Sequence, residues 1–447
     1  MSTAAPAASP AAELRRRLDE RTAVIGIVGL GYVGLPLARA VHRAGYPVLG
    51  YDVDPAKITA LEEGTTYLEH LGEDLSRELA ASDRFAVTCD DSRLAEADVI
   101  LLCVPTPLGK HNEPDLSFVL DSTRMCAKVL RRGQLIVLES TTYPGTTRDE
   151  MGPILEAGGL RCGEDFFLAY SPEREDPGRQ GTTTETIPKL VGGCDAISGE
   201  LANQFYTSCI AQVHFVESAE IAEAAKLLEN IYRAVNIAMV NELKMLLTDM
   251  DIDVWQVIEA ASTKPFGFQP FFPGPGLGGH CIPIDPFYLT WKAKEIGRTT
   301  RFIELAGEVN RGMPRYVVDR VTSALNDDGH SLKDAEILII GVAYKPDIDD
   351  MRESPAAEII DLLDEAGANV AYHDPHVPVF PRMRKHDIDL QSVDLSDERL
   401  AAADCVLVVT DHQAVDYARI GAKARLVVDS RNAMIGVTDP AARVLKA

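Results

Sequence analysis

The sequence predicts an α/β protein with two doubly wound sheets, joined by a helical middle segment that contains one long central helix. Apolar, β-rich runs at 23–30 and 335–342 end in glycine, as buried parallel strands do. Helical stretches and further short strands alternate after each run, which is typical of parallel sheets covered by helices. Between them, Ser218 to about Met250 has the pattern of a single long helix.

The composition is that of an ordinary globular protein, and its charge limits the kinds of partner. The chain has 447 residues, 46% hydrophobic and 25% charged, enough for two or three domains with sizeable cores. The net charge of −24 argues against a nucleic-acid partner, since phosphate contacts require clustered lysine and arginine. An anionic small ligand is not excluded, because it needs only a local cationic pocket.

We expect neither a metal site nor a membrane partner. Eight cysteines are scattered without a CxxC pair, which is not the pattern of a zinc site or a disulfide framework and favours a reduced, cytoplasmic setting. Residues 1–13 lack the basic region and apolar core of a signal peptide, and no apolar run reaches the roughly eighteen residues of a membrane helix. Residues 1–20 are expected to be a disordered tail.

The first strand leads directly into a glycine-rich turn with the spacing of a dinucleotide-binding fingerprint. The turn is 29–34, a helical stretch at 35–44 follows, and a second strand ends in an acid at position 52. The glycines allow the tight turn and let a pyrophosphate approach the helix N-terminus. The acid, with no adjacent arginine, favours NAD over NADP. This Rossmann-like unit predicts NAD as the cofactor, bound by Gly29, Gly31, Tyr32, Val33, Gly34 and Asp52.

Two threonines follow further strands of the same pattern. The strands at 98–104 and 134–139 end in turns that carry Thr106 and Thr141. Ligands of open α/β sheets bind beyond the carboxyl ends of the strands, so both threonines are candidates for contact with cofactor or substrate. Ordinary turn chemistry is the alternative explanation. The strand pattern of this region ends in a polar loop at 167–178.

The middle segment and the second sheet follow. Lys226 and Asn230 are one turn apart on the long helix, so both point the same way, although a solvated lysine is the default on any helix. Further helix is expected at 304–309 and 315–325. The strand at 335–342 is joined by strands at 370–374, 405–410 and 426–429, without a full GxGxxG. We therefore do not expect a second dinucleotide bound in the same way.

Residues 274–285 form a glycine-rich stretch that carries a lone cysteine. Cys281 follows the glycines, and Asp285 lies four positions further on. Glycines permit backbone conformations closed to other residues and let a ligand approach closely, so a thiol presented there is placed as a nucleophile. The alternative is a cysteine that packs as a small hydrophobe.

Together, NAD and a nucleophilic cysteine suggest oxidation of a carbonyl through a thiohemiacetal and then a thioester, which water cleaves to a carboxylate. Lys226 and Asn230 are candidates to donate to the oxygens that develop charge. Asp285 or Glu173 is the candidate to orient or deprotonate water. Because a nearby carboxylate raises the pKa of a thiol, a cation is needed to favour the thiolate, and Lys226 is the candidate.

At this point the chain resembles the nucleotide-sugar 6-dehydrogenase family, within the UDP-glucose/GDP-mannose dehydrogenase superfamily. The resemblance runs from about Ala23 to Val437. It rests on several motifs in the right order: Gly29-Leu-Gly-Tyr-Val-Gly34, Val104-Pro-Thr-Pro107, Ser140-Thr141, Ser171-Pro-Glu173, Lys226 with Asn230, Gly278-Gly-His-Cys281 with Asp285, and Lys345 to Arg352.

The resemblance implies a four-electron oxidation of a sugar C6 hydroxymethyl to a carboxylate, with two NAD consumed per sugar. By position, Cys281 resembles the thioester-forming nucleophile, while Lys226, Asn230 and Asp285 resemble the oxyanion and water-activating group. The remaining roles that it implies are Thr141 and Glu173 as helpers, Arg352 toward the cofactor, and Glu173, Arg174, Lys226, Asn230, Gly278 and Lys345 for the UDP-sugar.

The family also implies a homodimer built around the long central helix, with an arginine crossing into the partner's site; Arg311 is our candidate. The biosynthesis of cell-surface polysaccharides is the implied pathway. The expected domains are the tail at 1–20, an NAD-binding domain at 21–215, a central helical and catalytic-cysteine domain at 216–325, and a UDP-sugar-binding domain at 326–447.

Two departures from the glucose-specific pattern point to another substrate. Pro177 stands where glucose enzymes carry a second glutamate, and no lysine directly precedes Asp285. The segments 263–268 and 272–291 look like the branch that acts on UDP-N-acetylhexosamines, and the loop after Glu173 is most similar to UDP-N-acetylglucosamine 6-dehydrogenases. The manno epimer and UDP-glucose are the alternatives.

Two rival functions stay open. A one-step hydroxyacid dehydrogenase has the same layout but needs no cysteine. A catalytically silent NAD-binding scaffold would need none of the ordered set Thr141, Glu173, Lys226, Asn230, Cys281 and Asp285.

Overall fold

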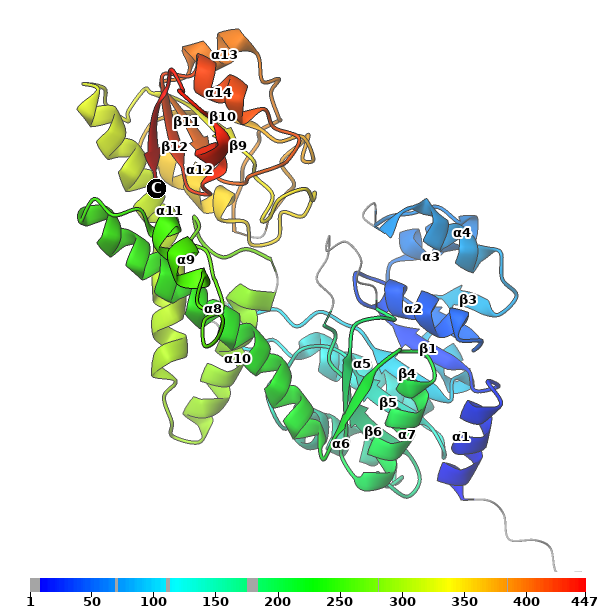
Figure 1. The fold of residues 1–447 in the computed structure, drawn as a ribbon. Helices are drawn as coiled ribbons and strands as arrows, with labels where there is room; N and C mark the ends of the chain where they lie inside the picture. The colour runs from blue at the N-terminus through cyan, green and yellow to red at the C-terminus, as the bar shows by residue number, and fades with distance from the viewer. Residues whose placement is uncertain (1–8, 69–70, 110–112, 175–183, 280, 384) are drawn as a thin grey trace, which may run out of the picture. The chain divides into compact units, whose positions relative to one another are not determined.

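The computed structural model describes residues 9–68, 71–109, 113–174, 184–279, 281–383 and 385–447. They form two compact units, of which the first comprises residues 1–229 with 287–298 and the second comprises 230–286 with 299–447. Each unit contains one mostly or wholly parallel sheet with helices against it (Figure 1). The predicted fold class, two doubly wound sheets with a helical middle segment, is confirmed.

The first unit is built on an eight-stranded sheet in the order β3-β2-β1-β4-β5-β6-β7-β8. All neighbouring strands are parallel except the β6–β7 pair. The strands are β1 (Ile25–Val28), β2 (Val48–Tyr51), β3 (Phe85–Thr88), β4 (Val99–Leu102), β5 (Leu135–Leu138), β6 (Phe167–Tyr170), β7 (Lys189–Gly193) and β8 (Val213–Val216). Because β1 lies between β2 and β4, the strand order reverses beside it, which is where open α/β sheets bind ligands.

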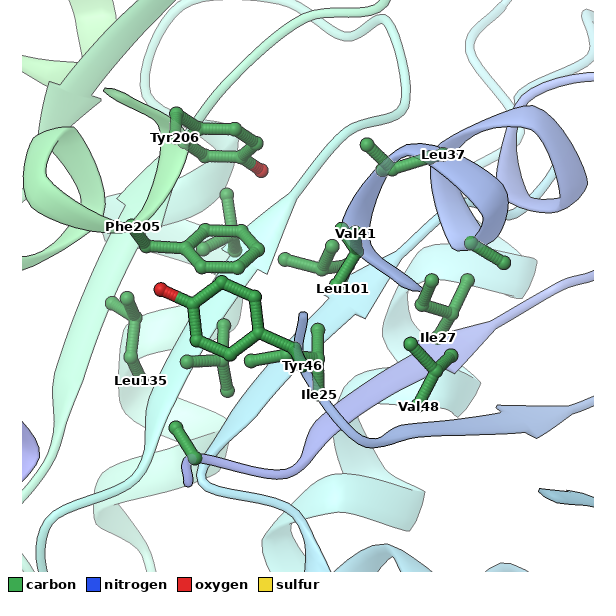
Figure 2. Close-up of a cluster of buried hydrophobic side chains, with 14 of the residues drawn as sticks. Ile25, Ile27, Leu37, Val41, Tyr46, Val48, Leu101, Leu135, Phe205 and Tyr206 are labelled. Atoms are coloured by element: carbon green, nitrogen blue, oxygen red, sulfur yellow. The ribbon is translucent and has the colours of Figure 1, made fainter. Parts of the chain in front are cut away.

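Helices cover this sheet because each buries one apolar face on it. Figure 2 shows Leu37 and Val41 of helix α2 packed over Ile25 and Ile27 of β1. The other described helices of this unit are α1 (Pro10–Asp19), α3 (Pro55–Glu63), α4 (Glu73–Ala80), α5 (Ser117–Val129), α6 (Gly152–Glu156) and α7 (Ala196–Thr207), with α2 at Gly34–Arg43 and the 3₁₀ turn η2 at Asp91–Glu96. A π-helical turn, η3 (Thr146–Met151), precedes α6. This packed core holds in place the edge of the sheet at which the predicted cofactor site lies.

The predicted tail was wrong for residues 10–19, which form helix α1. The Ser9 side chain accepts a hydrogen bond from the Ala12 N–H at 3.2 Å, which caps the helix. Leu14 and Leu18 are buried in the first core, so their apolar contact stabilises the helix. The alanine- and proline-rich composition of the N-terminal segment led to the prediction of a tail, although residues 10–19 form an amphipathic helix.

The strand pattern of the first unit also continues beyond its predicted end. Strands β7 and β8 extend the sheet, and β7 pairs antiparallel with β6 through Tyr170 and Gly192. A lysine opens β7, and β8 is only partly buried, so neither has the continuous apolar run of a central strand. Both segments form strands because they pair with strands that are connected to them by a long stretch of chain.

The second unit contains a five-stranded, wholly parallel sheet in the order β10-β9-β11-β12-β13. Its strands are β9 (Glu336–Ile340), β10 (Asn369–His373), β11 (Cys405–Val408), β12 (Leu426–Asp429) and β13 (Arg443–Lys446). Its helices are α9 (Val254–Ser262), α11 (Arg301–Asp327), α12 (Pro355–Glu365), α13 (Asp397–Ala402) and α14 (Tyr417–Lys423), with a 3₁₀ turn η4 at Ala433–Gly436. Two helices run from one unit into the other, α8 (Ala219–Asp249) and α10 (Cys281–Glu295). The predicted long helix is therefore confirmed.

Helix α11 is continuous where two helical stretches were expected. Pro314 lies inside it and removes one backbone hydrogen bond, which ordinarily breaks a helix. Pro314, Met313 and Val317 are all buried, and this packing compensates for the lost bond. Among the described residues, no helix has both the length and the apolar character that crossing a membrane requires.

Candidate functional site

The glycine turn after β1 is built for close backbone approach. Gly29 has a φ of +92°, and a Cβ there would lie 2.5 Å from the Cys103 carbonyl oxygen. A Cβ on Gly34 would lie 1.8 Å from the Gly29 carbonyl oxygen, whereas one on Gly31 would meet nothing within 4 Å. Gly29 and Gly34 are thus required by the turn itself, and Gly31 leaves open space at the N-terminal end of α2. This arrangement fits a dinucleotide pyrophosphate.

Asp52 closes the turn from the end of β2. Its buried carboxylate accepts a hydrogen bond from the Leu30 N–H at 2.9 Å and another from the Asp54 N–H at 3.0 Å. The Lys57 ammonium lies 2.9 Å from the same carboxylate, a pairing that the sequence pattern did not reveal. Asp52 therefore fixes the turn, and it lies at the position where a ribose hydroxyl donates to an acid in this motif. Tyr32 and Val33 lie within the same turn; Tyr32 is partly exposed, and Val33 is the residue before α2.

Gly34→Ala should destabilise the protein without NAD and abolish NAD binding. The new methyl group overlaps the Gly29 carbonyl, and such overpacking costs about 1–3 kcal/mol. Gly31→Ala is the matched control: we expect unchanged unfolding free energy but weakened NAD binding, since its methyl group fills only the open space. Thermal unfolding without cofactor and titration calorimetry with NAD separate the two effects. Equal unfolding curves for both variants would contradict this account of the turn.

Thr106 and Thr141 lie at the same edge of the sheet, after the neighbouring strands β4 and β5. Thr106 is buried and Thr141 is partly buried. Between them, the Ser140 hydroxyl donates to the Val104 carbonyl at 2.6 Å and accepts from the Val104 N–H at 3.1 Å. Ser140 therefore ties the two strand ends together, which places both threonines beyond the strands as predicted.

Glu173 lies beside a buried ion pair that the sequence pattern did not reveal. The Lys189 ammonium is 2.7 Å from Glu139 and 3.6 Å from Glu173, and the Tyr206 hydroxyl donates to Glu139. Burial opposes the charge on Lys189, but the two carboxylates outweigh it and raise the pKa of this lysine. The Arg174 N–H donates to Glu173 at 2.6 Å.

Arg174 is engaged within the first unit. Its guanidinium pairs with Glu229 of α8 at 2.7 Å and donates to the Pro188 carbonyl at 2.6 Å. The predicted substrate contact at Arg174 would therefore have to compete with, or add to, these two bonds. Residues 175–183, including Pro177, lie outside the described residues.

Lys226 and Asn230 are both buried on α8, so the default of a solvated lysine does not hold. Within the second unit, the Asn230 amide donates to Asp285 of α10 at 2.5 Å. The Arg233 guanidinium donates to the Asn230 carbonyl oxygen at 2.5 Å. Two predicted site residues, Asn230 and Asp285, are thus brought into direct contact, and Arg233 fixes which way the amide faces.

The backbone of Cys281 begins helix α10, four residues before Asp285. Positions 281 and 285 are therefore one turn apart on the same helix. The side chain of Cys281 and all of His280 lie outside what the structure describes. A helical start, rather than a loop, is the local setting of this cysteine.

The glycines before Cys281 rest on the segment that follows β9. The Gly279 N–H donates to the Arg352 carbonyl at 2.8 Å, and a Cβ on Gly278 would lie 2.5 Å from the Tyr344 Cβ. The Arg352 guanidinium pairs with Asp350 at 2.6 Å, and the Lys345 ammonium is 5.7 Å from the centre of the Tyr344 ring. The predicted residues Gly278, Lys345 and Arg352 therefore share one loop cluster in the second unit.

Two further contacts position this loop. The Gly274 N–H donates to the Asn241 side chain at 3.0 Å, and the Asn241 amide donates to Asn310 at 3.0 Å. A Cβ on Gly274 would lie 2.7 Å from an Arg431 guanidinium nitrogen. Sequence reasoning missed Asn241 and Arg431, because nothing local marks a residue that contacts a distant glycine.

Lys244 is a buried cation without a hydrogen-bond partner among the described residues. Its ammonium lies 5.7 Å from the centre of the Tyr316 ring. The pKa of Lys244 is lowered to about 7, chiefly by burial, with the charges of Arg431 and Arg320 also lowering it against the opposing effect of Asp429.

Lys244→Met should raise the free energy of unfolding at pH 7 by about 1–4 kcal/mol. The pKa of Lys244 is about 7 in the folded chain and 10.5, the ordinary value of lysine, in the unfolded chain, so between these values the unfolded chain binds a proton that the folded chain does not. Wild-type stability at this site therefore rises with pH across that window, and the advantage of the variant shrinks as pH approaches 10. Denaturant unfolding at pH 7, 8.5 and 10 measures this.

Lys333→Met, at an exposed position, is the control and should show no such pH-dependent difference. A Lys244→Met variant that is less stable than the wild type at pH 7 would show that the ammonium is paired in solution.

One group of side chains in the second unit has the composition of a metal site, namely Asp347, His376 and His412. However, the His412 Nδ1 accepts a hydrogen bond from the Asp347 N–H at 3.0 Å. Its Nε2 is 3.0 Å from Asp374 and donates to it. Both ring nitrogens of His412 are therefore engaged, which argues against a metal at this cluster.

Comparison with protein families gives three consecutive matches over the chain. They are the NAD binding domain, the central domain and the UDP binding domain of the UDP-glucose/GDP-mannose dehydrogenase family, at residues 23–210, 220–312 and 338–435.

Individual relatives span most of the chain. A UDP-N-acetyl-D-glucosamine 6-dehydrogenase of Pseudomonas aeruginosa is 36% identical over 81% of this chain and 85% of its own. A UDP-N-acetyl-D-mannosamine dehydrogenase of Pyrococcus horikoshii is 34% identical over 91% and 95%. The solved structure of a UDP-D-ManNAc dehydrogenase from Pyrococcus horikoshii matches with a TM-score of 0.85 at 32% identity, covering 95% of this chain and 98% of that one.

Proposed function

Because this chain belongs to the UDP-glucose/GDP-mannose dehydrogenase family, we propose that it oxidises the C6 hydroxymethyl of UDP-N-acetylglucosamine to a carboxylate. The chain is an NAD-dependent oxidoreductase with a UDP-sugar binding domain. Relatives that act on UDP-N-acetylglucosamine and on UDP-N-acetylmannosamine support an N-acetylhexosamine substrate. The loop after Glu173 favours the gluco epimer, and the manno epimer is the second candidate.

The observation that carries the four-electron proposal is the contact between Asn230 and Asp285, one helical turn from Cys281. A one-step alcohol oxidation needs no cysteine and no carboxylate beside it. Asp285 is buried and accepts a hydrogen bond from the Asn230 amide, so its carboxylate is held in one orientation as the candidate base for water. This pairing supports thioester hydrolysis as the last step of the proposed reaction.

In the proposed reaction, NAD when bound accepts one hydride in each of two oxidations. Cys281 attacks the intermediate aldehyde as a thiolate and forms the thiohemiacetal that the second oxidation converts to a thioester. Helix α10 begins at this residue, and the free N–H groups of a first helical turn favour negative charge. Lys226 donates to the oxygen that develops charge, and Asp285 takes the proton of the water that releases the carboxylate.

The hydrogen bonds that Asn230 already makes limit how many it can make to the substrate. One amide hydrogen is used by Asp285, and the carbonyl oxygen accepts from Arg233. A single amide hydrogen is left for substrate. We therefore assign Asn230 chiefly to the orientation of Asp285, with at most one direct bond to the sugar.

The test of the substrate is a comparison of kcat/KM for UDP-N-acetylglucosamine, UDP-N-acetylmannosamine and UDP-glucose at saturating NAD. We expect the highest value for UDP-N-acetylglucosamine, by at least about tenfold, because a site that bonds one hydroxyl discriminates against its epimer. An equal or higher value for the manno epimer would contradict the gluco proposal and leave the N-acetylhexosamine class in place.

We also propose that the protein is a homodimer that pairs through α8. Exposed apolar side chains recur along the second-unit part of this helix at intervals of three, four and seven residues, namely Tyr232, Met239, Leu243 and Leu246, and Met250 follows the helix end. A row of apolar side chains exposed to water is unfavourable and is typical of a protein–protein interface. Arg311 of α11 is exposed and remains the candidate to reach the partner's site.

Leu243→Asp should convert the dimer to a monomer, because it buries a charge in the proposed interface. Sedimentation velocity measures the change. The control is Val379→Asp, an exposed position in the second unit away from α8, which should sediment as the wild type does. A wild-type monomer would contradict the proposal.

A further inference from the structure

The first unit contains a buried cation that is shared between two acids. Lys189 lies 2.7 Å from Glu139 and 3.6 Å from Glu173, and its ammonium also donates to the Pro172 carbonyl at 3.4 Å. Both Lys189 and Glu139 are almost fully buried. The family resemblance gives Lys189 no role, and the reaction proposed above does not use it.

Strand pairing explains how a lysine reaches this place. Strand β7 runs antiparallel to β6, with Tyr170 opposite Gly192. The first residue of β7, Lys189, therefore lies beyond the carboxyl end of β6, at the edge that carries the segment 171–174. Because β7 runs in the opposite direction to β6, its first residue lies at the ligand-binding edge.

Glu139 is held independently of Glu173. It accepts from the Tyr206 hydroxyl, and the Lys189 ammonium also lies 5.3 Å from the centre of the Tyr206 ring. Glu139 and Tyr206 thus fix the ammonium from one side, while its other side faces Glu173. A buried lysine that contacted only one acid would form an internal ion pair. Because Lys189 also faces Glu173, its positive charge also acts at the ligand-binding edge.

The backbone of Glu173 does not depend on Lys189. The Ser171 N–H donates to the Leu138 carbonyl at 3.0 Å, and the Glu173 N–H donates to the Glu139 carbonyl at 3.3 Å. One carboxylate oxygen of Glu173 accepts from the Arg174 N–H, and the other is the one nearest to Lys189. What the lysine adds is therefore positive charge beside the Glu173 side chain.

We propose that Lys189 is a positioning residue for Glu173: its ammonium, 3.6 Å away, holds that carboxylate in one orientation at the ligand-binding edge. The inference rests on the proposed function and on the helper role that the family resemblance implies for Glu173. The charged and titratable groups around Lys189 are Glu139, Glu173, Tyr206 and the thiols of Cys103 and Cys209. Burial raises the pKa of both thiols, so they stay neutral and leave Glu139 and Glu173 as the counter-charges.

Lys189→Met should lower kcat at pH 7 by about tenfold or more and change KM less. Without the ammonium, the Glu173 carboxylate loses the cation that orients it, so the reaction slows while the sugar nucleotide still binds. Lys189→Arg keeps the charge and should recover most of the activity.

Loss of the lysine also leaves Glu139 buried without its cation, so a second variant separates folding from function. Glu139→Gln with Lys189→Met replaces the ion pair by two neutral side chains of similar size, and thermal unfolding should return close to that of the wild type. The loss of kcat should persist in this double variant, because Glu173 still has no cation beside it. A wild-type kcat in the double variant would overturn the proposal.

A double-mutant cycle with Glu173→Gln gives the decisive comparison. If Lys189 acts through Glu173, then Lys189→Met should cause no further loss of kcat in the Glu173→Gln background. Losses that multiply, or full activity of Glu173→Gln alone, would overturn the inference. Failure of the proposed function is distinguishable, because the wild type itself would then oxidise none of the three UDP-sugars.

Discussion

Replacing Cys281 with serine should lower kcat for UDP-sugar oxidation by at least about 1000-fold while leaving NAD binding unchanged. A serine hydroxyl is a far weaker nucleophile than a thiolate, so the covalent step stalls. The turn that we propose to hold NAD lies in the first unit and contains no part of the 274–285 stretch. Steady-state kinetics and NAD calorimetry on the same preparation measure both quantities.

Cys89→Ser is the matched control for this substitution. Cys89 is an exposed free cysteine after strand β3, and its loss should leave kcat within about twofold of the wild type. A one-step dehydrogenase would tolerate both substitutions equally. A Cys281→Ser enzyme with more than a tenth of the wild-type kcat would therefore contradict the covalent route.

Asp285→Asn should lower kcat by about 100- to 10,000-fold and trap the enzyme as a thioester. The amide has nearly the same shape as the carboxylate, and its oxygen can still accept from the Asn230 amide, so the fold is kept. It cannot take a proton from water, which is the contribution of a general base. Rapid mixing should show a burst of NADH, and intact mass measurement should show an added uronyl group.

The doubly substituted chain, Cys281→Ser with Asp285→Asn, is the control for that adduct and should carry none. Non-additive losses are expected, because both residues serve one covalent path. Asp285→Asn with wild-type turnover would show that water is activated by another group, with Glu173 as the next candidate.

Local patterns were enough to predict the first βαβ unit. Gly29, Gly34 and Asp52 are neighbours in the fold because they are fixed by short-range geometry: a tight turn, a helix start and a strand end in register. The same holds for the long helix α8, whose pattern extends over many turns. The pairing of Asn230 with Asp285 was suggested only by the family resemblance, since the two lie far apart in the chain.

Long-range packing explains what sequence reasoning missed. Lys189 is buried only because β7 pairs with β6, and Lys244 only because α8 packs within the second unit, whereas each reads locally as an ordinary solvated lysine. Pro314 reads locally as a helix end, but burial keeps α11 continuous. The burial and conformation of these residues depend on tertiary contacts, which cannot be recognised from the local sequence around each residue.

The most direct test of the central claim is the number of NADH molecules formed per UDP-N-acetylglucosamine. A limiting amount of the sugar nucleotide is run to completion with excess NAD, and NADH is measured by its absorbance. The four-electron route through Cys281 predicts two NADH per sugar and a uronic acid product. One NADH per sugar, with an aldehyde as product, would contradict it.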